Sequence, residues 1–347
     1  MRISVFGLGH VGVAFFWAFG RVRGRPTLVL AADAKGGFLG DLAPAQVIER
    51  KKRGDYDFRR EAGDVGALLD KARPDVHVEL TPTNLENGTP AEPDVLAALD
   101  RGIPVVTAAK SHQRSREALA NVLERARGLP FLDHAATLAG IPATEMATGL
   151  GFEVTKIEGV LNGTTNYILK RLGEGASFEA ALEEAIQKGF AEREWRYDVE
   201  GLDVAVKLVG LTRRLLGTIT GAADARLEGD AALGLTRGIS GVTTDLVARL
   251  AREGKKLKLV GEVVKDGDGA RARVGPRVLP HDDPFARIDG FNNAVRIEGQ
   301  MNGTRMELFL RGPGAGADET ASRVLGNLNH LIEVLAWRRG GRSGGLP

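Results

Sequence analysis

The stretch GLGHVG at Gly7–Gly12 follows directly on the apolar run Arg2–Phe6 and leads into the apolar, helix-like segment Val13–Gly20. A glycine-rich turn between a strand and a helix can hold a dinucleotide, because glycines permit a tight turn and a close approach of the backbone to the pyrophosphate. The start of the helix also offers unpaired N–H groups to the phosphates. Similar turns join strands to helices in proteins that bind no nucleotide, so the stretch alone leaves both interpretations open.

Short apolar runs alternate with amphipathic helical stretches up to about residue 135, and this rhythm favours the dinucleotide interpretation. The run VVTAA at Val105–Ala109 has no polar face, which is typical of a strand buried on both faces of a parallel sheet. We therefore predict a Rossmann-type α/β domain with a doubly wound parallel sheet over residues 1–135. Its strand candidates are Arg2–Phe6, Thr27–Ala31, Val76–Leu80, Val105–Ala108 and Phe131–Asp133.

The pattern changes after residue 150, where helices come first and strands then follow one another without intervening helices. An Asn302-Gly303 pair between two alternating runs predicts a hairpin turn. We therefore predict a second, α+β domain over residues 136–311, for substrate binding and dimerisation. Its helices are expected at 164–172, 177–188 and 202–216, and its strands at 154–160, 256–264, 271–278, 294–300 and 305–311.

The C-terminal segment 312–338 contains an amphipathic helix at Glu319–Trp337, which we expect to pack back on the first domain. Residues 339–347 are rich in glycine and arginine, have no apolar periodicity and are predicted to form a flexible tail.

The composition is that of an ordinary soluble protein, with 347 residues, 43% hydrophobic and 27% charged residues, and a net charge of +2. This length favours two domains, and the nearly neutral charge does not indicate a nucleic-acid partner. The chain has no cysteine, which excludes disulfides and thiolate metal sites. No apolar stretch reaches the ~18 residues of a spanning helix, so we expect a cytoplasmic protein without a membrane partner.

Two charged residues after the second strand bear on the choice of coenzyme. Asp33 stands 21 residues after Gly12 and can accept a hydrogen bond from a ribose 2′-OH, which favours NAD. Lys35 can meet the 2′-phosphate of NADP. Both residues can also be solvated loop charges, so the coenzyme preference stays open.

A catalytic pair is predicted in the segment DVEGLDVAVK at Asp198–Lys207. Asp203 and Lys207 stand four residues apart on a predicted helix, so they share one face and can form an ion pair. Hydride addition to an aldehyde creates an alkoxide, and an ammonium can supply either a proton or a positive charge to it. Pairs at this spacing are also common structural salt bridges, and spacing alone favours that simpler reading.

The segment GVLNGTTNYIL at Gly159–Leu169 joins a predicted strand to a predicted helix. Asn162 or Thr164 can cap the helix, since both side chains accept hydrogen bonds from the first N–H groups. The exposed N–H groups of the same turn can instead hold a substrate carboxylate. Both uses are compatible with the sequence.

Taken together, these segments resemble the homoserine dehydrogenases along nearly the whole chain. NGTTNYIL followed in order by DVEGLDVAVK is far more specific than a glycine fingerprint alone. The other segments that carry the resemblance are GLGHVG, ELTPTN at Glu79–Asn84, GIPVVTAAK at Gly102–Lys110 and GPGAGADETAS at Gly312–Ser322.

The resemblance implies NAD(P)H-dependent, reversible reduction of L-aspartate 4-semialdehyde to L-homoserine, a step in threonine, methionine and isoleucine biosynthesis. It implies Lys207 and Asp203 as the catalytic pair and Lys110 as a second proton-donor candidate. It implies that the substrate is bound by Glu192, Asp198, Gly163 and Thr164. It adds Thr83, Lys110, Gly314 and Gly316 to the residues expected to bind the coenzyme, NADP or NAD. The others, already indicated by the sequence around the first two strands, are Gly7, Gly9, His10, Val11, Gly12, Asp33 and Lys35.

Three further expectations follow from the resemblance. His134 stands where the family has a glutamate that binds a structural monovalent cation, and a neutral imidazole is a poor ligand for such a hard ion. Activity should therefore depend little on sodium or potassium. The chain ends soon after GPGAG, as in a short form without the C-terminal regulatory domain, so feedback inhibition by threonine through that domain is not expected. A homodimer is expected.

Two other functions remain as alternatives. The nearest is a related amino-acid-type dehydrogenase with another small substrate, because a fold does not determine its substrate. The other is a dinucleotide-binding sensor that has lost catalysis. Coenzyme binding without turnover would indicate the sensor.

Overall fold

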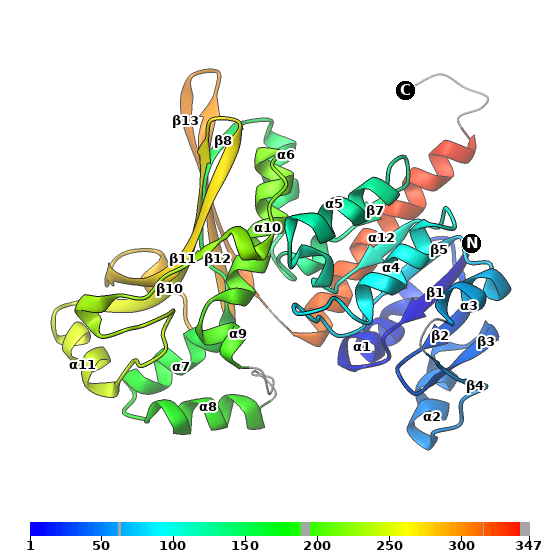
Figure 1. Ribbon diagram of the computed structural model, residues 1–347, viewed down its shortest axis with the longest axis horizontal. Helices are drawn as coiled ribbons and strands as arrows, with labels where there is room; N and C mark the ends of the chain where they lie inside the picture. The colour runs from blue at the N-terminus through cyan, green and yellow to red at the C-terminus, as the bar shows by residue number, and fades with distance from the viewer. Residues whose placement is uncertain (62–63, 189–194, 315, 341–347) are drawn as a thin grey trace. The chain divides into compact units, whose positions relative to one another are not determined.

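The computed structural model describes residues 1–61, 64–188, 195–314 and 316–340. The chain forms two compact units, each with its own sheet (Figure 1). The first unit contains Met1–Ala139 and the C-terminal segment from Gly316, and the second contains Gly140–Ala315.

The first unit contains a seven-stranded sheet with the order β4-β3-β2-β1-β5-β6-β7. The strands β1, β2, β5, β6 and β7 are parallel, and β3 and β4 add an antiparallel edge. Chain order reverses between β1 and β5, which is where open α/β sheets bind their ligands. The strands are β1 Arg2–Phe6, β2 Thr27–Ala32, β3 Gly36–Leu42, β4 Phe58–Arg59, β5 Val76–Glu79, β6 Val105–Thr107 and β7 Phe131–Leu132.

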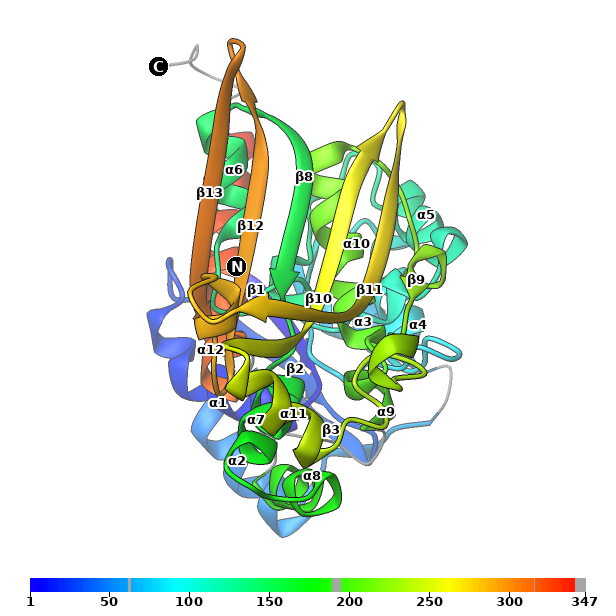
Figure 2. The same ribbon diagram turned by 90° about the vertical axis from the view of Figure 1, so that its left-hand side faces the viewer.

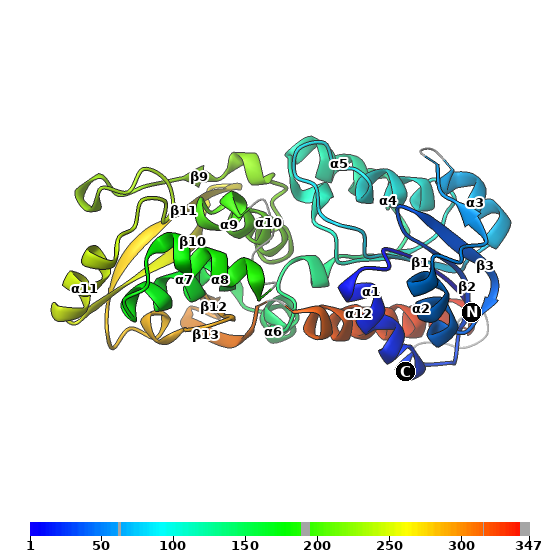
Figure 3. The same cartoon turned by 90° about the horizontal axis from the view of Figure 1, so that it is seen from below.

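Both faces of this sheet are buried, since neighbouring residues on one strand belong to different cores. Val5 of β1 packs in one cluster with Phe15 and Leu328, whereas Phe6 packs in the other with Val95. The last helix, α12, lies along α1, as Figure 3 shows. The helices of this unit are α1 His10–Ala18, α2 Pro44–Arg53, α3 Val65–Ala72, α4 Ala91–Leu99, α5 Arg116–Arg125 and α12 Ala317–Gly340.

The predicted Rossmann-type fold is confirmed, but the antiparallel edge strands were not predicted. The sequence of β3, GGFLGDL, has three glycines and no clear alternation, so it does not resemble a strand. Two of these glycines, Gly36 and Gly37, are needed for close packing: a Cβ at Gly37 would lie 2.5 Å from the Phe58 ring. Helix α12 extends to Gly340, two residues into the predicted tail.

The second unit contains a six-stranded sheet with the order β13-β12-β8-β10-β11-β9 (Figure 2). The predicted hairpin at Asn302-Gly303 is confirmed between β12 and β13, where both residues have positive φ, 50° and 78°. The strands are β8 Glu153–Val160, β9 Arg226–Leu227, β10 Lys255–Asp266, β11 Gly269–Pro280, β12 Asn292–Met301 and β13 Thr304–Pro313.

Helix α10 packs closely on β10, and its bounds are those predicted from the sequence, Leu202–Leu216. The close approach depends on Gly261 of β10, where a Cβ would lie 2.6 Å from Val204 of the helix. In the described part of the chain, no helix is long and apolar enough to cross a membrane. The other helices of this unit are α6 Ala143–Leu150, α7 Gly163–Gly173, α8 Phe178–Gln187, α9 Arg196–Val199 and α11 Thr244–Arg252.

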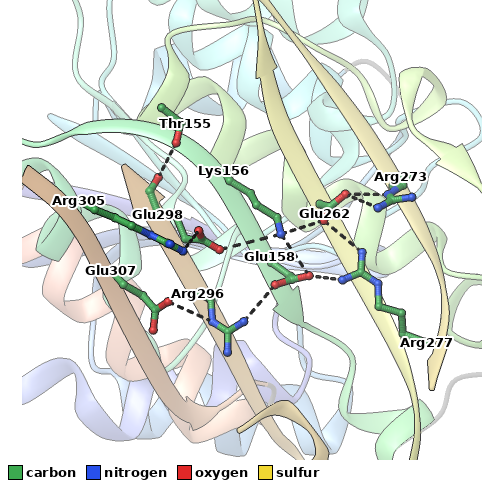
Figure 4. A network of polar contacts seen from close by, with 10 residues as sticks. All are labelled: Thr155, Lys156, Glu158, Glu262, Arg273, Arg277, Arg296, Glu298, Arg305 and Glu307. Atoms are coloured by element: carbon green, nitrogen blue, oxygen red, sulfur yellow. Dashed lines mark hydrogen bonds and ion pairs between the residues drawn. The ribbon is translucent and has the colours of Figure 1, made fainter. Parts of the chain in front are cut away.

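A network of ion pairs crosses the second sheet from β13 to β11 (Figure 4). At its centre are the buried carboxylates of Glu158 on β8 and Glu262 on β10. The Glu262 carboxylate lies 3.1 Å from Lys156 Nζ and 3.2 Å from an Arg277 nitrogen, and it accepts a 2.7 Å hydrogen bond from Arg273 Nε. Burial alone would raise the pKa of Glu262, but the hydrogen bonds from Arg273, Lys156 and Arg277 outweigh it and lower the pKa to about 2.

Candidate functional site

The three glycines of the GLGHVG turn have three different surroundings. Gly7 has a φ of +95°, and a Cβ there would lie 2.2 Å from the Leu80 carbonyl carbon. A Cβ at Gly12 would lie 2.0 Å from the Gly7 oxygen. A Cβ at Gly9 would have no atom within 4 Å. Gly7 and Gly12 are therefore required for packing, whereas Gly9 leaves open space at the start of α1.

This turn lies at the point where the strand order of the sheet reverses. The Gly7 N–H donates to the Ala32 carbonyl at 2.8 Å, and the Leu80 N–H donates to the Phe6 carbonyl at 2.7 Å. Gly9 caps α1 with extended backbone, and the first turn of that helix contains no acidic residue. His10 is exposed and Val11 half-buried. The first N–H groups of α1 therefore suit an anionic ligand such as a pyrophosphate.

The loops after β5 and β6 are joined through two of the predicted coenzyme residues. The Lys110 N–H donates to the Thr83 hydroxyl at 3.0 Å, and the Asn84 N–H donates to the Ser111 hydroxyl at 3.0 Å. Thr83 and Lys110 come from segments 27 residues apart and meet at the carboxyl edge of the sheet. The half-buried Lys110 therefore lies at the edge of the first sheet where the coenzyme is predicted to bind.

A buried polar chain supports the turn against which Gly7 packs, and sequence reasoning missed it. Ser4 Oγ lies 2.9 Å from His77 Nδ1, and His77 Nε2 lies 3.2 Å from a Glu79 carboxylate oxygen. The other Glu79 oxygen accepts from the Thr81 N–H at 2.8 Å. Burial, together with the charge of Glu79, raises the pKa of nearby Asp94 to about 6. The polar residues His77 and Glu79 within the otherwise apolar run VHVEL were the available signal.

The remaining predicted coenzyme residues lie in turns. Asp33 directly follows β2, and Lys35 lies exposed in the turn to β3. Gly316 precedes α12 with a φ of +134°, and a Cβ there would lie 1.9 Å from a Glu319 carboxylate oxygen. Gly314 lies in the second unit, where a Cβ would lie 1.9 Å from Asn293 Cγ.

The predicted catalytic pair forms on α10 in the second unit. Lys207 Nζ lies 2.8 Å from Asp203 Oδ2 and donates a 2.6 Å hydrogen bond to the Leu161 carbonyl. Asn293 Nδ2 donates to the same carbonyl at 2.9 Å. The side chain of Lys207 is 6% exposed and that of Asp203 17%. The ammonium is therefore held at a defined position, with limited access to solvent.

Asn162 connects two of the predicted residues, although the sequence suggested only capping or backbone contacts for its segment. Its Oδ1 accepts from the Thr165 N–H at 2.8 Å and so caps α7. Its Nδ2 donates to Asp198 Oδ1 at 2.6 Å and to Asp203 Oδ2 at 2.9 Å. Asn162 therefore fixes both carboxylates relative to the start of α7.

Gly163 and Thr164 form the first turn of α7, beside this group. A Cβ at Gly163 would lie 3.1 Å from Phe291 Cα, so the glycine permits a close approach of two backbones. Thr164 is buried. Glu192, predicted to bind the substrate, lies outside the described residues.

The second unit thus combines a buried ammonium, two carboxylates and the N-terminus of a helix. An ammonium can stabilise or protonate a developing alkoxide, carboxylates can bind a substrate ammonium, and the helix start suits a carboxylate.

His134 lies in a short 3-10 turn after β7. Among the described residues, no group of three or more His, Asp or Glu side chains is arranged to hold a metal ion.

Comparisons with known proteins agree on one family. The family model described as homoserine dehydrogenase matches residues 144–328. The homoserine dehydrogenase of Methanocaldococcus jannaschii is 35% identical over 315 residues, which are 88% of each chain. The NAD(+)-dependent homoserine dehydrogenase of Pseudomonas canavaninivorans is 33% identical over 76% of this chain and 73% of the relative. A solved structure, a mutant homoserine dehydrogenase of a hyperthermophilic archaeon in complex with NADPH, has a TM-score of 0.76 and 25% identity, covering 96% of this chain and 98% of its own.

Proposed function

This chain belongs to the homoserine dehydrogenase family of NAD(P)-dependent oxidoreductases, and on that premise we propose that it reduces the aldehyde of L-aspartate 4-semialdehyde to the alcohol of L-homoserine. The reaction is reversible and serves the biosynthesis of threonine, methionine and isoleucine. The observation that carries the proposal is the Lys207–Asp203 pair, 2.8 Å apart and joined to Asp198 through Asn162.

The reduced nicotinamide coenzyme supplies the hydride, and the residues of this chain manage the charge that develops on the substrate oxygen. Lys207 stabilises the alkoxide or donates the proton to it. Asp203 holds the ammonium, because it pairs with Lys207 one helical turn away. Lys110, on the coenzyme side of the first unit, is the alternative proton donor.

The substrate of this reaction is an amino acid, so the site needs partners for an ammonium and a carboxylate. We assign the ammonium to Asp198 and Glu192, with Glu192 assigned on family resemblance alone. The carboxylate is assigned to the start of α7 at Gly163 and Thr164, where N–H groups and the positive end of the helix dipole favour an anion.

The direct test is an assay with aspartate 4-semialdehyde and each reduced coenzyme, beside related aldehydes of similar size. We expect aspartate 4-semialdehyde to have the highest kcat/KM. A higher kcat/KM for another aldehyde would indicate the related dehydrogenase. Coenzyme binding without turnover of any aldehyde would indicate the sensor.

We also propose that the protein is a homodimer that associates through the sheet of the second unit. The family resemblance is one support. The other is the network of Figure 4, which carries exposed groups of both signs, such as Arg305 and Glu307 on β13. A surface with both charges can be complementary to a copy of itself across a two-fold axis. The cytoplasmic location expected from the sequence stays a prediction.

A further inference from the structure

The carboxylate of Asp33 lies beside the glycine-rich turn, at the end of the neighbouring strand. The residue before it, Ala32, accepts the hydrogen bond from the Gly7 N–H. In Rossmann-type sheets an acidic residue at this place meets the ribose of the adenosine. Whether Asp33 discriminates between NAD and NADP depends on how firmly it is held.

Three donors of the protein fix this carboxylate. Its Oδ1 accepts from the Lys35 N–H at 2.8 Å and from the Gly36 N–H at 3.3 Å. Its Oδ2 accepts from the Tyr56 hydroxyl at 3.1 Å. The side chain is only 16% exposed. Asp33 therefore cannot turn away from a ligand without breaking several hydrogen bonds.

Tyr56 is itself held in place. Its ring stacks on the buried ring of Phe38, with centroids 5.3 Å apart and planes at 29°. Burial and the hydrogen bond to Asp33 raise the pKa of Tyr56 to about 12, so the hydroxyl keeps its proton and remains a donor near neutral pH. The orientation of the carboxylate is therefore set by the packing beneath the turn.

Two lysines lie close to the same carboxylate. Lys51 Nζ on α2 is 3.8 Å from Asp33 Oδ2 and donates a hydrogen bond to the Leu8 carbonyl in the glycine-rich turn. Lys35 is exposed, two residues after Asp33. Lys51 therefore connects the predicted pyrophosphate turn to the predicted ribose carboxylate.

We propose that the fixed carboxylate of Asp33 makes NAD(H) the preferred coenzyme of this protein, with Lys51 supplying the residual affinity for a 2′-phosphate. A ribose 2′-OH donates to the carboxylate, whereas a 2′-phosphate brings up to two negative charges against it and has few protons to donate near neutral pH. The inference rests on the proposed function in one respect only: the protein must bind a nicotinamide dinucleotide.

The first test measures binding of the adenosine half alone and needs no substrate. The probes are 5′-ADP and 2′,5′-ADP, titrated calorimetrically into the full-length protein at constant ionic strength. We expect 5′-ADP to bind at least about tenfold more tightly, the discrimination expected of a like-charge contact. Equal or tighter binding of 2′,5′-ADP would overturn the proposal. Because no aldehyde is present, this outcome is independent of whether the protein turns over aspartate 4-semialdehyde.

Asp33→Asn keeps an acceptor for the Lys35 and Gly36 N–H groups and removes the charge. It should weaken 5′-ADP and strengthen 2′,5′-ADP, so that the ratio of the two affinities falls about tenfold or more. Adding Lys51→Met should abolish the gain in 2′,5′-ADP affinity. The matched control is Asp55→Asn, which removes an exposed carboxylate that pairs with Arg50. An unchanged ratio in Asp33→Asn, or an equal change in Asp55→Asn, would refute the role of Asp33.

Tyr56→Phe separates the position of the carboxylate from its charge. The variant keeps the ring and Asp33 but loses the 3.1 Å hydrogen bond. We expect weaker discrimination against 2′,5′-ADP, with at most a small change in the melting temperature. Full discrimination in Tyr56→Phe would show that the charge of Asp33 acts without being fixed by Tyr56. The ratio of kcat/KM for NADH and NADPH should follow the binding ratio in every active variant.

Discussion

Lys207 is the residue whose charge the proposed chemistry needs most. Lys207→Met keeps most of the side chain's length and removes the ammonium. Because the alkoxide charge develops only as the hydride arrives, kcat should fall by about two to four orders of magnitude while coenzyme affinity barely changes. Steady-state kinetics and a coenzyme titration measure the two effects.

The control for this variant is Lys170→Met, which removes an exposed lysine of α7. It should leave both quantities unchanged. If the Lys207→Met protein instead keeps a near-normal kcat and has a raised KM, Lys110 is the proton donor and Lys207 only binds the substrate. Asp203→Asn should also lower kcat, and the double variant should lose far less than the sum of the two effects, because the pair acts as a unit.

Gly9 and Gly12 allow coenzyme binding to be tested apart from folding. Gly9→Val places its side chain where the structure has no atom within 4 Å, on backbone with a φ of −73° that valine can adopt. We expect a normal melting temperature and a large loss of coenzyme affinity, because the side chain occupies the place of the pyrophosphate.

Gly12→Ala is the comparison, since its Cβ would lie 2.0 Å from the Gly7 oxygen. It should destabilise the fold by about 1–3 kcal/mol, as overpacked sites do. Thermal unfolding and a coenzyme titration on both variants give the result. Unchanged coenzyme affinity in a folded Gly9→Val protein would place the coenzyme elsewhere.

The stability of the second sheet should depend on pH, because the buried carboxylate of Glu262 contributes to it only when it is ionised. Its pKa in the folded protein, about 2, is below the ordinary value of 4.5. The carboxylate therefore stabilises the fold fully above about pH 4.5 and loses this contribution as the pH falls toward 2. We expect Glu262→Gln to lower the free energy of unfolding by roughly 1–3 kcal/mol near neutral pH, and this difference should shrink below pH 4.5.

Urea unfolding over this pH range measures the difference. Glu253→Gln is the control, because Glu253 is an exposed partner of Lys255 and its loss should have little effect at any pH. A Glu262→Gln deficit that stays constant down to pH 3 would show that the side chain acts by packing rather than by charge.

At the scale of the whole molecule, the proposed homodimer can be tested by the mass of the protein in solution. Sedimentation or light scattering at micromolar concentration should give twice the chain mass of 37.0 kDa. If the charged sheet face forms the interface, rising salt should shift the equilibrium toward the monomer, because exposed charges are screened. A monomer mass with full activity would contradict the assembly.

The sequence alone determined the fold class and the course of the main elements. Helix α10 and the hairpin at Asn302-Gly303 lie where they were predicted, because periodicity and turn residues act over a few neighbouring positions. The pair Asp203 and Lys207 could be predicted for the same reason, since one helical turn brings them together. The edge strand β3 escaped prediction because Gly36 and Gly37 serve its packing against Phe58, a distant residue that no local pattern indicates.

Only the tertiary structure decided what surrounds the predicted residues. Asn162 reaches Asp198 and Asp203 across 36 and 41 residues of chain, and Tyr56 reaches Asp33 across 23. Such contacts depend on where a sheet and its loops place distant segments, and no spacing in the sequence encodes them. The sequence could therefore predict that Asp33 contacts the ribose, but it left the choice between NAD and NADP open. The tertiary structure holds the Asp33 carboxylate in place, and our proposal for the coenzyme preference rests on this.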